Sequence, residues 1–221
     1  MNAALVPVKP LAAGKSRLAG ALPREALERL GLAMLGDLVA ALRAVPALAR
    51  VAVATPDPRV AREAEALGAE ALLRDDPGLN AALDGAAREL ATARGGPGLE
   101  ALLVVLGDVP GAAPAELASM FDALRSLGGR GVVLAPSRDG GTSALLRAPF
   151  DAISNRFGPD SAAAHRAAAR EAGVPLRELA LPSLAVDLDR PEDALALLAG
   201  PGAPRTRALL AELRIGAELG A

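Results

Sequence analysis

The sequence predicts an α/β protein in which a mixed but mostly parallel sheet carries helices on both faces. Short runs rich in valine and leucine alternate with longer alanine-rich stretches of helical period along the 221 residues. Some runs, such as LLVVLGD at 102–108, are almost continuously apolar, which suits strands covered on both faces. The turn-forming sequence RDGG at 138–141 separates two further runs and predicts a hairpin, and therefore one antiparallel pair.

The predicted elements follow one another as strand, loop and helix. Pro23 suits the first turn of a long helix, and Gly68 suits the end of the helix after it. The expected strands lie at 3–7, 51–55, 70–75, 102–108, 131–137, 142–148 and 184–189. The expected helices lie at 23–45, 56–68, 79–93, 158–173, 190–200 and 206–214. One buried core is within reach of a chain of this length, so we expect a single domain over residues 1–221.

The composition excludes several classes of function. The chain has no cysteine, so it can form neither disulfides nor thiolate metal sites, and its N-terminus does not resemble a secretion signal. A net charge of -2 and an aromatic content of 1% argue against a nucleic-acid partner. The apolar runs are too short to span a bilayer, so no membrane segment is expected. We expect a cytoplasmic protein that binds small molecules.

The loop after the first predicted strand is rich in cations. Gly14, Lys15 and Ser16 are the letters that close a phosphate-binding P-loop, but that pattern requires a glycine where this chain has Lys9. The loop is therefore not a P-loop. Together with Arg17, these residues can still place cations and backbone N–H groups around a polyphosphate. The alternative is a solvated loop with a basic bias, and the loop alone does not decide between the two.

Three aspartates lie at the ends of two predicted strands. Asp108 follows the apolar run at 102–107, while Asp187 and Asp189 end the last predicted strand. Alternate residues of a strand point to one face about 6–7 Å apart, so the last two can share a cavity. Carboxylate oxygens of this kind suit Mg²⁺. In the alternative reading, Asp187 or Asp189 caps the helix beginning at Pro191 and Asp108 is a turn residue.

The segment Gly158-Pro159-Asp160-Ser161 places a proline at the start of a predicted helix, whose first N–H groups are then free for an anion. From the residues alone this segment is equally a well-formed helix start. His165 lies one turn further on and is the only histidine of the chain. We expect it to be a surface or packing residue, because it has no partner for nucleophilic catalysis in a recognised pattern.

Six motifs together resemble one family, and they keep its order along nearly the whole chain. They are VPVKPLAAGKSRL at 6–18, DDPGLNAAL at 75–83, LGDVP at 106–110, GGTSALL at 140–146, RFGPDS at 156–161 and VDLDRPED at 186–193. The sequence is similar to the phosphoenolpyruvate or 2-phospholactate guanylyltransferases of deazaflavin coenzyme F-420 biosynthesis. The resemblance implies a Rossmann-like fold of the nucleotide-diphosphosugar transferase type.

The resemblance also implies roles for individual residues. The first loop, with Lys9, Gly14, Lys15, Ser16 and Arg17, is expected to wrap the phosphates of GTP. Mg²⁺ is expected on Asp108, Asp187 and Asp189, with Lys15, Arg17 and Asp108 acting in catalysis. The acceptor is expected at Thr142, Gly158 and Ser161, and the nucleobase near Gly78 and Asn80. Ser143 departs from the asparagine that relatives often carry, which affects one local hydrogen bond.

The reaction implied by the resemblance is transfer of GMP from GTP to phosphoenolpyruvate, with release of pyrophosphate. An acceptor phosphate that is already ionised needs no general base, so a chain with one histidine can catalyse it. The alternatives are 2-phospho-L-lactate as acceptor, a related nucleotidyltransferase acting on a molybdopterin or sugar phosphate, and an inactive nucleotide-binding subunit. The sequence leaves the oligomeric state open, with a homodimer as one candidate.

Overall fold

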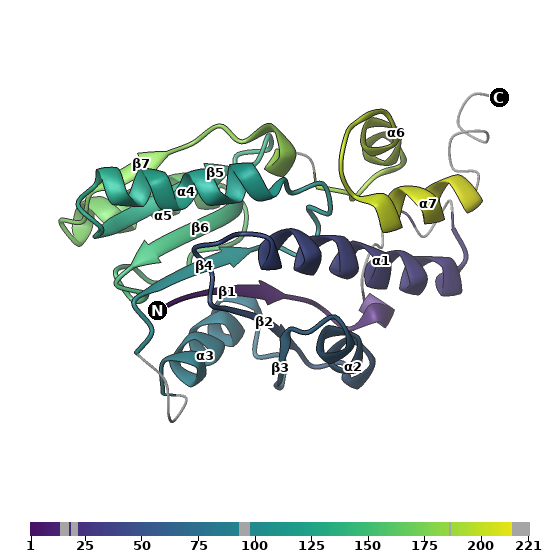
Figure 1. Cartoon of the computed structure of the whole chain (residues 1–221), viewed down its shortest axis with the longest axis horizontal. Coiled ribbons are helices and arrows are strands. Elements are labelled where there is room, and N and C mark those ends of the chain that lie inside the picture. Colours follow the sequence, from purple (N-terminus) through teal and green to yellow (C-terminus); the bar gives the residue numbers. More distant parts are fainter. Residues whose placement is uncertain (14–17, 19–21, 93–97, 186, 214–221) are drawn as a thin grey trace.

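The computed structural model describes residues 1–13, 18, 22–92, 98–185 and 187–213. Their strands form one seven-stranded sheet (Figure 1). The strands are β1 (Asn2–Pro7), β2 (Arg50–Thr55), β3 (Glu70–Leu73), β4 (Ala101–Val105), β5 (Gly131–Pro136), β6 (Thr142–Ala148) and β7 (Leu176–Glu178). The helices are α1 (Arg24–Arg43), α2 (Pro58–Ala66), α3 (Leu79–Thr92), α4 (Pro114–Ser126), α5 (Ser161–Glu171), α6 (Pro191–Ala199) and α7 (Pro204–Glu212), with 3₁₀ turns η1 (Leu11–Ala13) and η2 (Pro182–Leu184).

The strand order is β3-β2-β1-β4-β6-β5-β7. Strands β1 to β4 pair in parallel, and β7 joins β5 in parallel at the far edge. Strand β6 lies between β4 and β5 and is antiparallel to both. The expected hairpin across RDGG and the expected mixed, mostly parallel sheet are therefore confirmed. The antiparallel direction of β6 also brings its first residues to the edge at which β4 ends.

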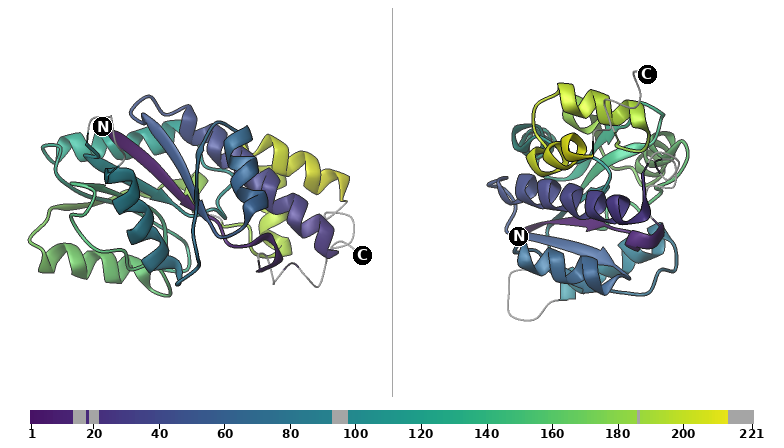
Figure 2. Two further views of the ribbon diagram at one scale, coloured as in Figure 1. Left: turned by 90° about the horizontal axis from the view of Figure 1, so that it is seen from below. Right: turned by 90° about the vertical axis from the view of Figure 1, so that its right-hand side faces the viewer.

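Both faces of the sheet are covered, because the apolar side chains of each strand alternate between two cores (Figure 2). In β1, Ala4 and Val6 pack towards α1, α2 and α4, whereas Ala3 and Leu5 pack towards α3 and α5. This alternation is the period of two that an extended strand imposes. No helix in the described part of the chain is long and apolar enough to cross a membrane.

A third cluster lies between α1 and the C-terminal helices α6 and α7, which pack beyond the end of the sheet (Figure 1). The cluster contains Leu30 of α1, Leu188 and Leu210 of α7. The buried carboxylate of Asp37 in α1 accepts the backbone N–H groups of Arg205 and Thr206 at 3.0 and 2.8 Å. These groups belong to the first turn of α7, which has no helical partner for them. Asp37 therefore fixes the C-terminal helices on α1.

Two parts of the architecture differ from the sequence prediction. The predicted strand at 184–189 is wrong, because its start belongs to η2 and the described residues after it form no regular element. Its two leucines enter different cores: Leu184 packs with α4 against the sheet, and Leu188 packs with α1, α6 and α7. The alternation of apolar residues at 184–189 is therefore typical of a strand, although the described residues there form none. Helix α4 and edge strand β7 are present although no such elements were predicted at these positions.

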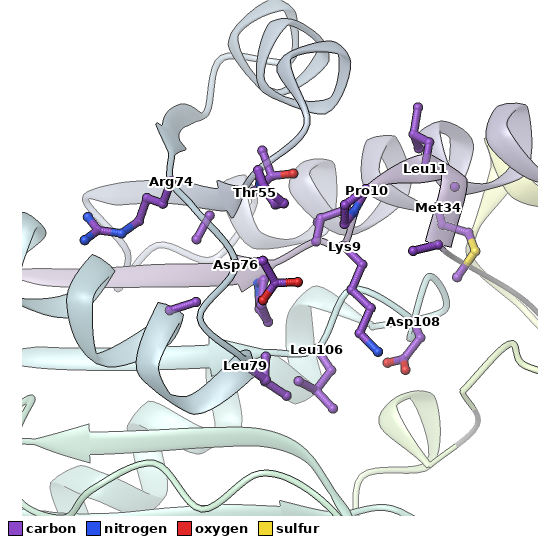
Figure 3. Close-up of a pocket in the computed structure, with 18 of the residues that line it drawn as sticks. Lys9, Pro10, Leu11, Met34, Thr55, Arg74, Asp76, Leu79, Leu106 and Asp108 are labelled. Atoms are coloured by element: carbon purple, nitrogen blue, oxygen red, sulfur yellow. The ribbon is translucent and has the colours of Figure 1, made fainter.

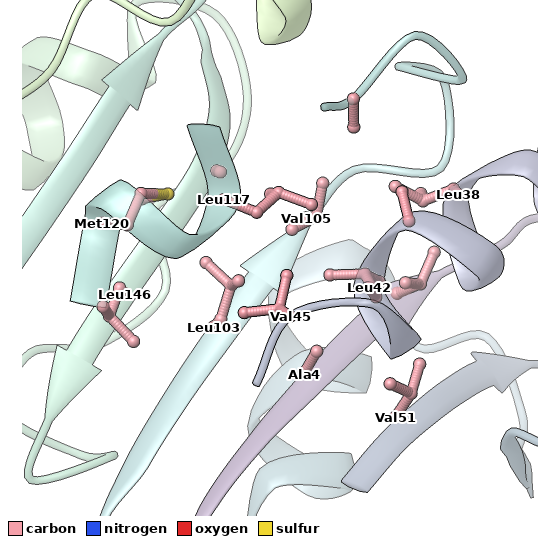
Figure 4. Packing of buried hydrophobic residues seen from close by; sticks show 14 of the residues in the cluster. Ala4, Leu38, Leu42, Val45, Val51, Leu103, Val105, Leu117, Met120 and Leu146 are labelled. Carbon is pink, nitrogen blue, oxygen red and sulfur yellow. The ribbon is translucent and has the colours of Figure 1, made fainter. Parts of the chain in front are cut away.

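We expect Leu103→Ala to lower the free energy of unfolding by about 2–5 kcal/mol, because it leaves a cavity in a close-packed core. Leu103 is fully buried between α1 and α4 (Figure 4). The matched control is Leu73→Ala, since the Leu73 side chain is 57% exposed at the end of β3. Urea denaturation measures both changes. Equal losses for the two variants would contradict this packing.

Candidate active site

A cleft of about 410 Å³ opens at the carboxyl ends of β1, β2, β3 and β4 (Figure 3). Strand β1 is the point at which the chain reverses direction across the sheet, since β2 and β3 lie on one side of it and β4 on the other. Ligands of open α/β sheets bind at such a position. The polar residues along the cleft are Lys9, Thr55, Arg74, Asp75, Asp76, Asp108 and Asp189.

The start of the cation-rich loop is held in place by Asp57, the N-cap of α2. One oxygen of Asp57 accepts the N–H of Leu11 at 3.0 Å, and the other accepts that of Arg59 at 2.8 Å. Burial acts to raise the pKa of Asp57, but these hydrogen bonds outweigh it and lower the pKa below its usual value. The Lys9 side chain points into the cleft towards Asp108 (Figure 3).

Four residues of this loop, Gly14, Lys15, Ser16 and Arg17, lie outside the described residues. Their expected contacts with nucleotide phosphates stay predictions. The described part of the loop agrees with such a role in one respect, because Lys9, Pro10, Leu11 and Ala13 all line the cleft.

The three predicted acids come together. Asp108, Asp187 and Asp189 each offer a carboxylate oxygen, and these oxygens lie within 4.8 Å of one another. The N–H of Leu188 donates to the carbonyl of Asp108 at 2.8 Å, and the Leu188 side chain is buried against α1. This anchor holds the two acids on either side of Leu188 next to Asp108 without any strand. Asp193, in the first turn of α6, accepts the N–H groups of Asp189 and Arg190, which lie just before that helix.

The electrostatics of this acid cluster fit a divalent cation. Burial, followed by repulsion from Asp189, Asp139 and Asp193, raises the pKa of Asp187 above its ordinary value. Carboxylates that disfavour one another's ionisation gain from a shared cation, and hard oxygen donors suit Mg²⁺ or a similar ion. Asp139 belongs to the β5–β6 turn, so this turn adds to the negative charge that acts on Asp187.

The predicted acceptor residues lie beside the same edge of the sheet. Thr142 begins β6, and the adjacent Ser143 carbonyl accepts the N–H of Leu106 at the end of β4. Ser161 begins α5, and its hydroxyl donates to Thr142 Oγ1 at 3.1 Å. Gly158 is exposed with φ of +143°, a conformation that side chains rarely adopt. The structure therefore brings Thr142 and Ser161 together, with Gly158 in the turn before α5.

Asn80 contacts the segment RFGPDS at 156–161, called the acceptor motif below, and is not among the residues lining the cleft. Its amide oxygen accepts the N–H of Phe157 at 2.8 Å, and its amide nitrogen donates to the Phe157 carbonyl at 3.0 Å. Gly78 also does not line the cleft and has φ of +97°. The nucleobase role of both residues stays a prediction. Helix α3 contributes Leu79 to the cleft, so Asn80 connects the cleft wall to the acceptor motif.

Sequence reasoning missed several residues of this site. Thr55, Arg74, Asp75 and Asp76 line the cleft from the ends of β2 and β3. The rule that functional side chains follow parallel strands would have found them. The contacts of His165 had no such signal, because they depend on the packing of α5 against β6.

Solved structures with similar folds define the class to which this one belongs. A nucleotide-diphospho-sugar transferase from Desulfovibrio desulfuricans G20 superposes with a TM-score of 0.73 at 19% identity, covering 96% of this chain and 94% of that one. A Mycobacterium tuberculosis H37Rv protein in complex with manganese superposes with a TM-score of 0.51 at 19% identity, covering 90% of this chain and 98% of that one. The fold is that of the nucleotide-diphospho-sugar transferases, as expected.

The chain belongs to the Guanylyl transferase CofC like family, whose model matches residues 2–220. It is 42% identical over 198 residues to the phosphoenolpyruvate guanylyltransferase of Sphaerobacter thermophilus, covering 89% of this chain and 92% of the relative. The family resemblance of the sequence motifs is thereby confirmed, and the chain is an enzyme of the nucleotidyltransferase class.

We expect Asp187→Asn to leave the melting temperature in chelator unchanged or to raise it at neutral pH. Because the folded-state pKa of Asp187 is raised, its charged form costs stability as pH rises through that pKa, and asparagine avoids this cost. Added Mg²⁺ should stabilise the wild type, by about 2.7 kcal/mol at a hundredfold excess over Kd, and the variant less. A variant that melts lower in chelator, or responds equally to Mg²⁺, would contradict this assignment.

Proposed function

We propose that this enzyme transfers GMP from GTP to phosphoenolpyruvate and releases pyrophosphate, as a step of coenzyme F-420 biosynthesis. The observation that carries the proposal is the 42% identity, over nearly the full length of both chains, to a phosphoenolpyruvate guanylyltransferase. The cleft supports it, because cations and carboxylates meet there at the ends of the parallel strands. A cytoplasmic location, expected from the cysteine-free sequence, is part of the same proposal.

In the reaction, an oxygen of the acceptor phosphate attacks the α-phosphorus of GTP. The new bond joins the two phosphorus atoms through that oxygen, and the bond from the α-phosphorus to the bridging β-oxygen breaks. Pyrophosphate leaves with the electron pair, so no side chain becomes covalently modified. The protein must hold two anions in line and stabilise the charge that develops on the leaving group. Lys9 lines the cleft and is proposed to contribute to this stabilisation, as are Lys15 and Arg17.

Asp108, Asp187 and Asp189 are proposed to hold Mg²⁺. Their oxygens are close enough for one ion, and the manganese complex of a structural neighbour supports a divalent ion on this fold. When bound, the ion would neutralise charge on the phosphate oxygens of the substrates. The chain's own contribution is to keep three carboxylates together despite their repulsion, through the bond between Leu188 and Asp108.

The absence of histidine from the described cleft agrees with a reaction that needs no general base. The only histidine of the chain, His165, is fully buried and has both ring nitrogens in hydrogen bonds. The acceptor phosphate is ionised near neutral pH and can attack without losing a proton. Placement and charge neutralisation are therefore sufficient.

Phosphoenolpyruvate is the proposed acceptor at Thr142, Gly158 and Ser161. It differs from 2-phospho-L-lactate in a planar methylene group against a methyl-bearing tetrahedral carbon, and both present the same phosphate and carboxylate. Polar contacts alone do not separate the two acids, since shape discrimination of this size is worth about 1–3 kcal/mol. The choice therefore rests on the relative from Sphaerobacter thermophilus.

A matrix of four nucleoside triphosphates against phosphoenolpyruvate, 2-phospho-L-lactate and 3-phosphoglycerate tests the proposal, with pyrophosphate release in Mg²⁺ as readout. We expect the highest specificity constant for GTP with phosphoenolpyruvate. A higher value for another acid would overturn the acceptor and leave the nucleotidyltransferase class intact. Release with another nucleotide in place of GTP would overturn the guanylyl assignment.

Loss of a residue that only orients a metal ligand lowers activity by about 10–100-fold. We expect Asp108→Asn to lower kcat by more than this, because it removes a proposed ligand itself. Asp122→Asn is the matched control, since Asp122 is an exposed residue of α4 that pairs with Arg125. Normal turnover of Asp108→Asn would remove Asp108 from the metal site.

We expect Lys15→Ala and Arg17→Ala to raise the KM for GTP without lowering the melting temperature. Loss of a charged hydrogen bond to phosphate corresponds to about tenfold or more in affinity. Steady-state kinetics at saturating acceptor measures the change, and Arg24→Ala is the control, because Arg24 is an exposed residue at the start of α1. Unchanged KM values for GTP in both variants would indicate a solvated loop.

A further inference from the structure

The hydroxyl groups of Thr142 and Ser161 are joined to the chain's single histidine in one buried network. His165 Nδ1 lies 3.0 Å from Thr142 Oγ1, and Ser161 Oγ lies 3.1 Å from the same oxygen. Thr142 is 2% exposed, Ser161 is 1% exposed and His165 is 0% exposed. Buried hydrogen bonds of this kind meet little competition from water.

The backbone determines which ring nitrogen of His165 carries the proton. The N–H of Arg156 donates to His165 Nε2 at 3.0 Å. A ring nitrogen accepts a hydrogen bond only when it carries no proton, so the neutral ring is protonated on Nδ1. The Nδ1–H group then donates to Thr142 Oγ1. The opposite tautomer would place two N–H groups head to head.

The tautomer determines what the hydroxyl pair can offer to a ligand. The pair has two hydroxyl protons, and one of them lies between Thr142 and Ser161 whichever hydroxyl donates. Because His165 donates a hydrogen bond to Thr142 and accepts none from the hydroxyl pair, one hydroxyl proton is left for a hydrogen bond to a third partner. With the proton on Nε2, Nδ1 would accept from Thr142 and no hydroxyl proton would remain.

We propose that His165 is a positioning residue that makes the Thr142–Ser161 pair a hydrogen-bond donor to an anionic oxygen of the phosphorylated acceptor acid. This inference rests on the proposed function, which places the acceptor at these two residues and Gly158. The same ring fixes the acceptor motif, because it binds Arg156 N–H and meets the Phe157 ring edge to face, with centroids 5.0 Å apart at 74°.

The surroundings of His165 keep the ring neutral, as this role requires. Burial lowers its pKa to about 4, and the positive charges of Arg147 on β6 and Arg156 in the acceptor motif act in the same direction, while the backbone of Ser161 opposes them by a smaller amount. A second ring proton would face the Arg156 N–H and break that bond. The hydroxyl pair therefore keeps one donor throughout the physiological pH range.

The first test is a nitrogen-15 NMR spectrum of the wild-type imidazole, in which a single histidine gives one set of signals. We expect the Nδ1–H tautomer at neutral pH and no titration until the pH approaches 4. Addition of phosphoenolpyruvate should shift the Nδ1 signal, whereas GTP alone should not. An Nε2–H tautomer, or an Nδ1 signal that ignores phosphoenolpyruvate, would overturn the inference.

The second test compares His165→Phe with His165→Asn. Phenylalanine fills the ring volume without a hydrogen bond, whereas the asparagine amide can still donate to Thr142. We expect the KM for phosphoenolpyruvate to rise about tenfold in His165→Phe, the effect of one hydrogen bond, with partial recovery in His165→Asn and an unchanged KM for GTP. Arg166→Ala is the control on α5, where Arg166 pairs with Glu178 on the surface.

The outcomes separate this inference from the proposed function. The inference alone is overturned if the wild type is active and His165→Phe keeps the wild-type KM for phosphoenolpyruvate. Equal increases in the KM values for phosphoenolpyruvate and GTP would overturn it as well. A wild type without this activity overturns the proposed function, and the NMR tautomer still tests the hydrogen-bond network. If His165→Phe does not fold, His165→Asn and the NMR spectrum decide.

Discussion

Burial of the sheet on both faces is the constraint from which the position of the site follows. Every residue of β4 and β6 is buried, so these strands have no face on which a polar ligand can bind. Chemistry is therefore confined to the edge where the strands end. Lys9, Asp108 and Asp189 border the cleft at that edge, and fully buried strands lie next to them.

Two features bring residues that are distant in sequence to this edge. The antiparallel direction of β6 puts Thr142 beside the end of β4, although a parallel strand in that position would end there with Ala148. The bond from Leu188 N–H to the Asp108 carbonyl brings Asp187 and Asp189 to the same place from the C-terminal part of the chain. Neither feature depends on the polar groups themselves. The core and the backbone assemble the site.

The three acids were identified from the sequence, but the strand expected to bring Asp187 and Asp189 together does not form, and the hydrogen bond from Leu188 to Asp108 takes its place. The fold class, in contrast, was predictable because it depends on local patterns. Alternating apolar runs gave the strands, and RDGG gave the hairpin. The predicted strand at 184–189 failed because Leu184 and Leu188 enter different cores, which no local pattern shows. His165 was expected to be a packing or surface residue, and it is buried. Its contacts with Thr142 and Arg156 arise from tertiary packing, which one histidine in an alanine-rich helix does not reveal.

The position of His165 agrees with the chemistry proposed for the cleft. Transfer between ionised phosphates requires no proton to be removed. An imidazole with a pKa of about 7 at the reacting atoms would therefore have no role as a general base. Here the ring is instead buried with a lowered pKa, and both nitrogens are used to hold Arg156 and Thr142. A histidine of this kind adds direction to neighbouring hydroxyl groups without adding charge. The hydroxyl pair, as a neutral donor, can stabilise one anionic oxygen of the acceptor acid, while the cations of the cleft neutralise the remaining phosphate oxygens.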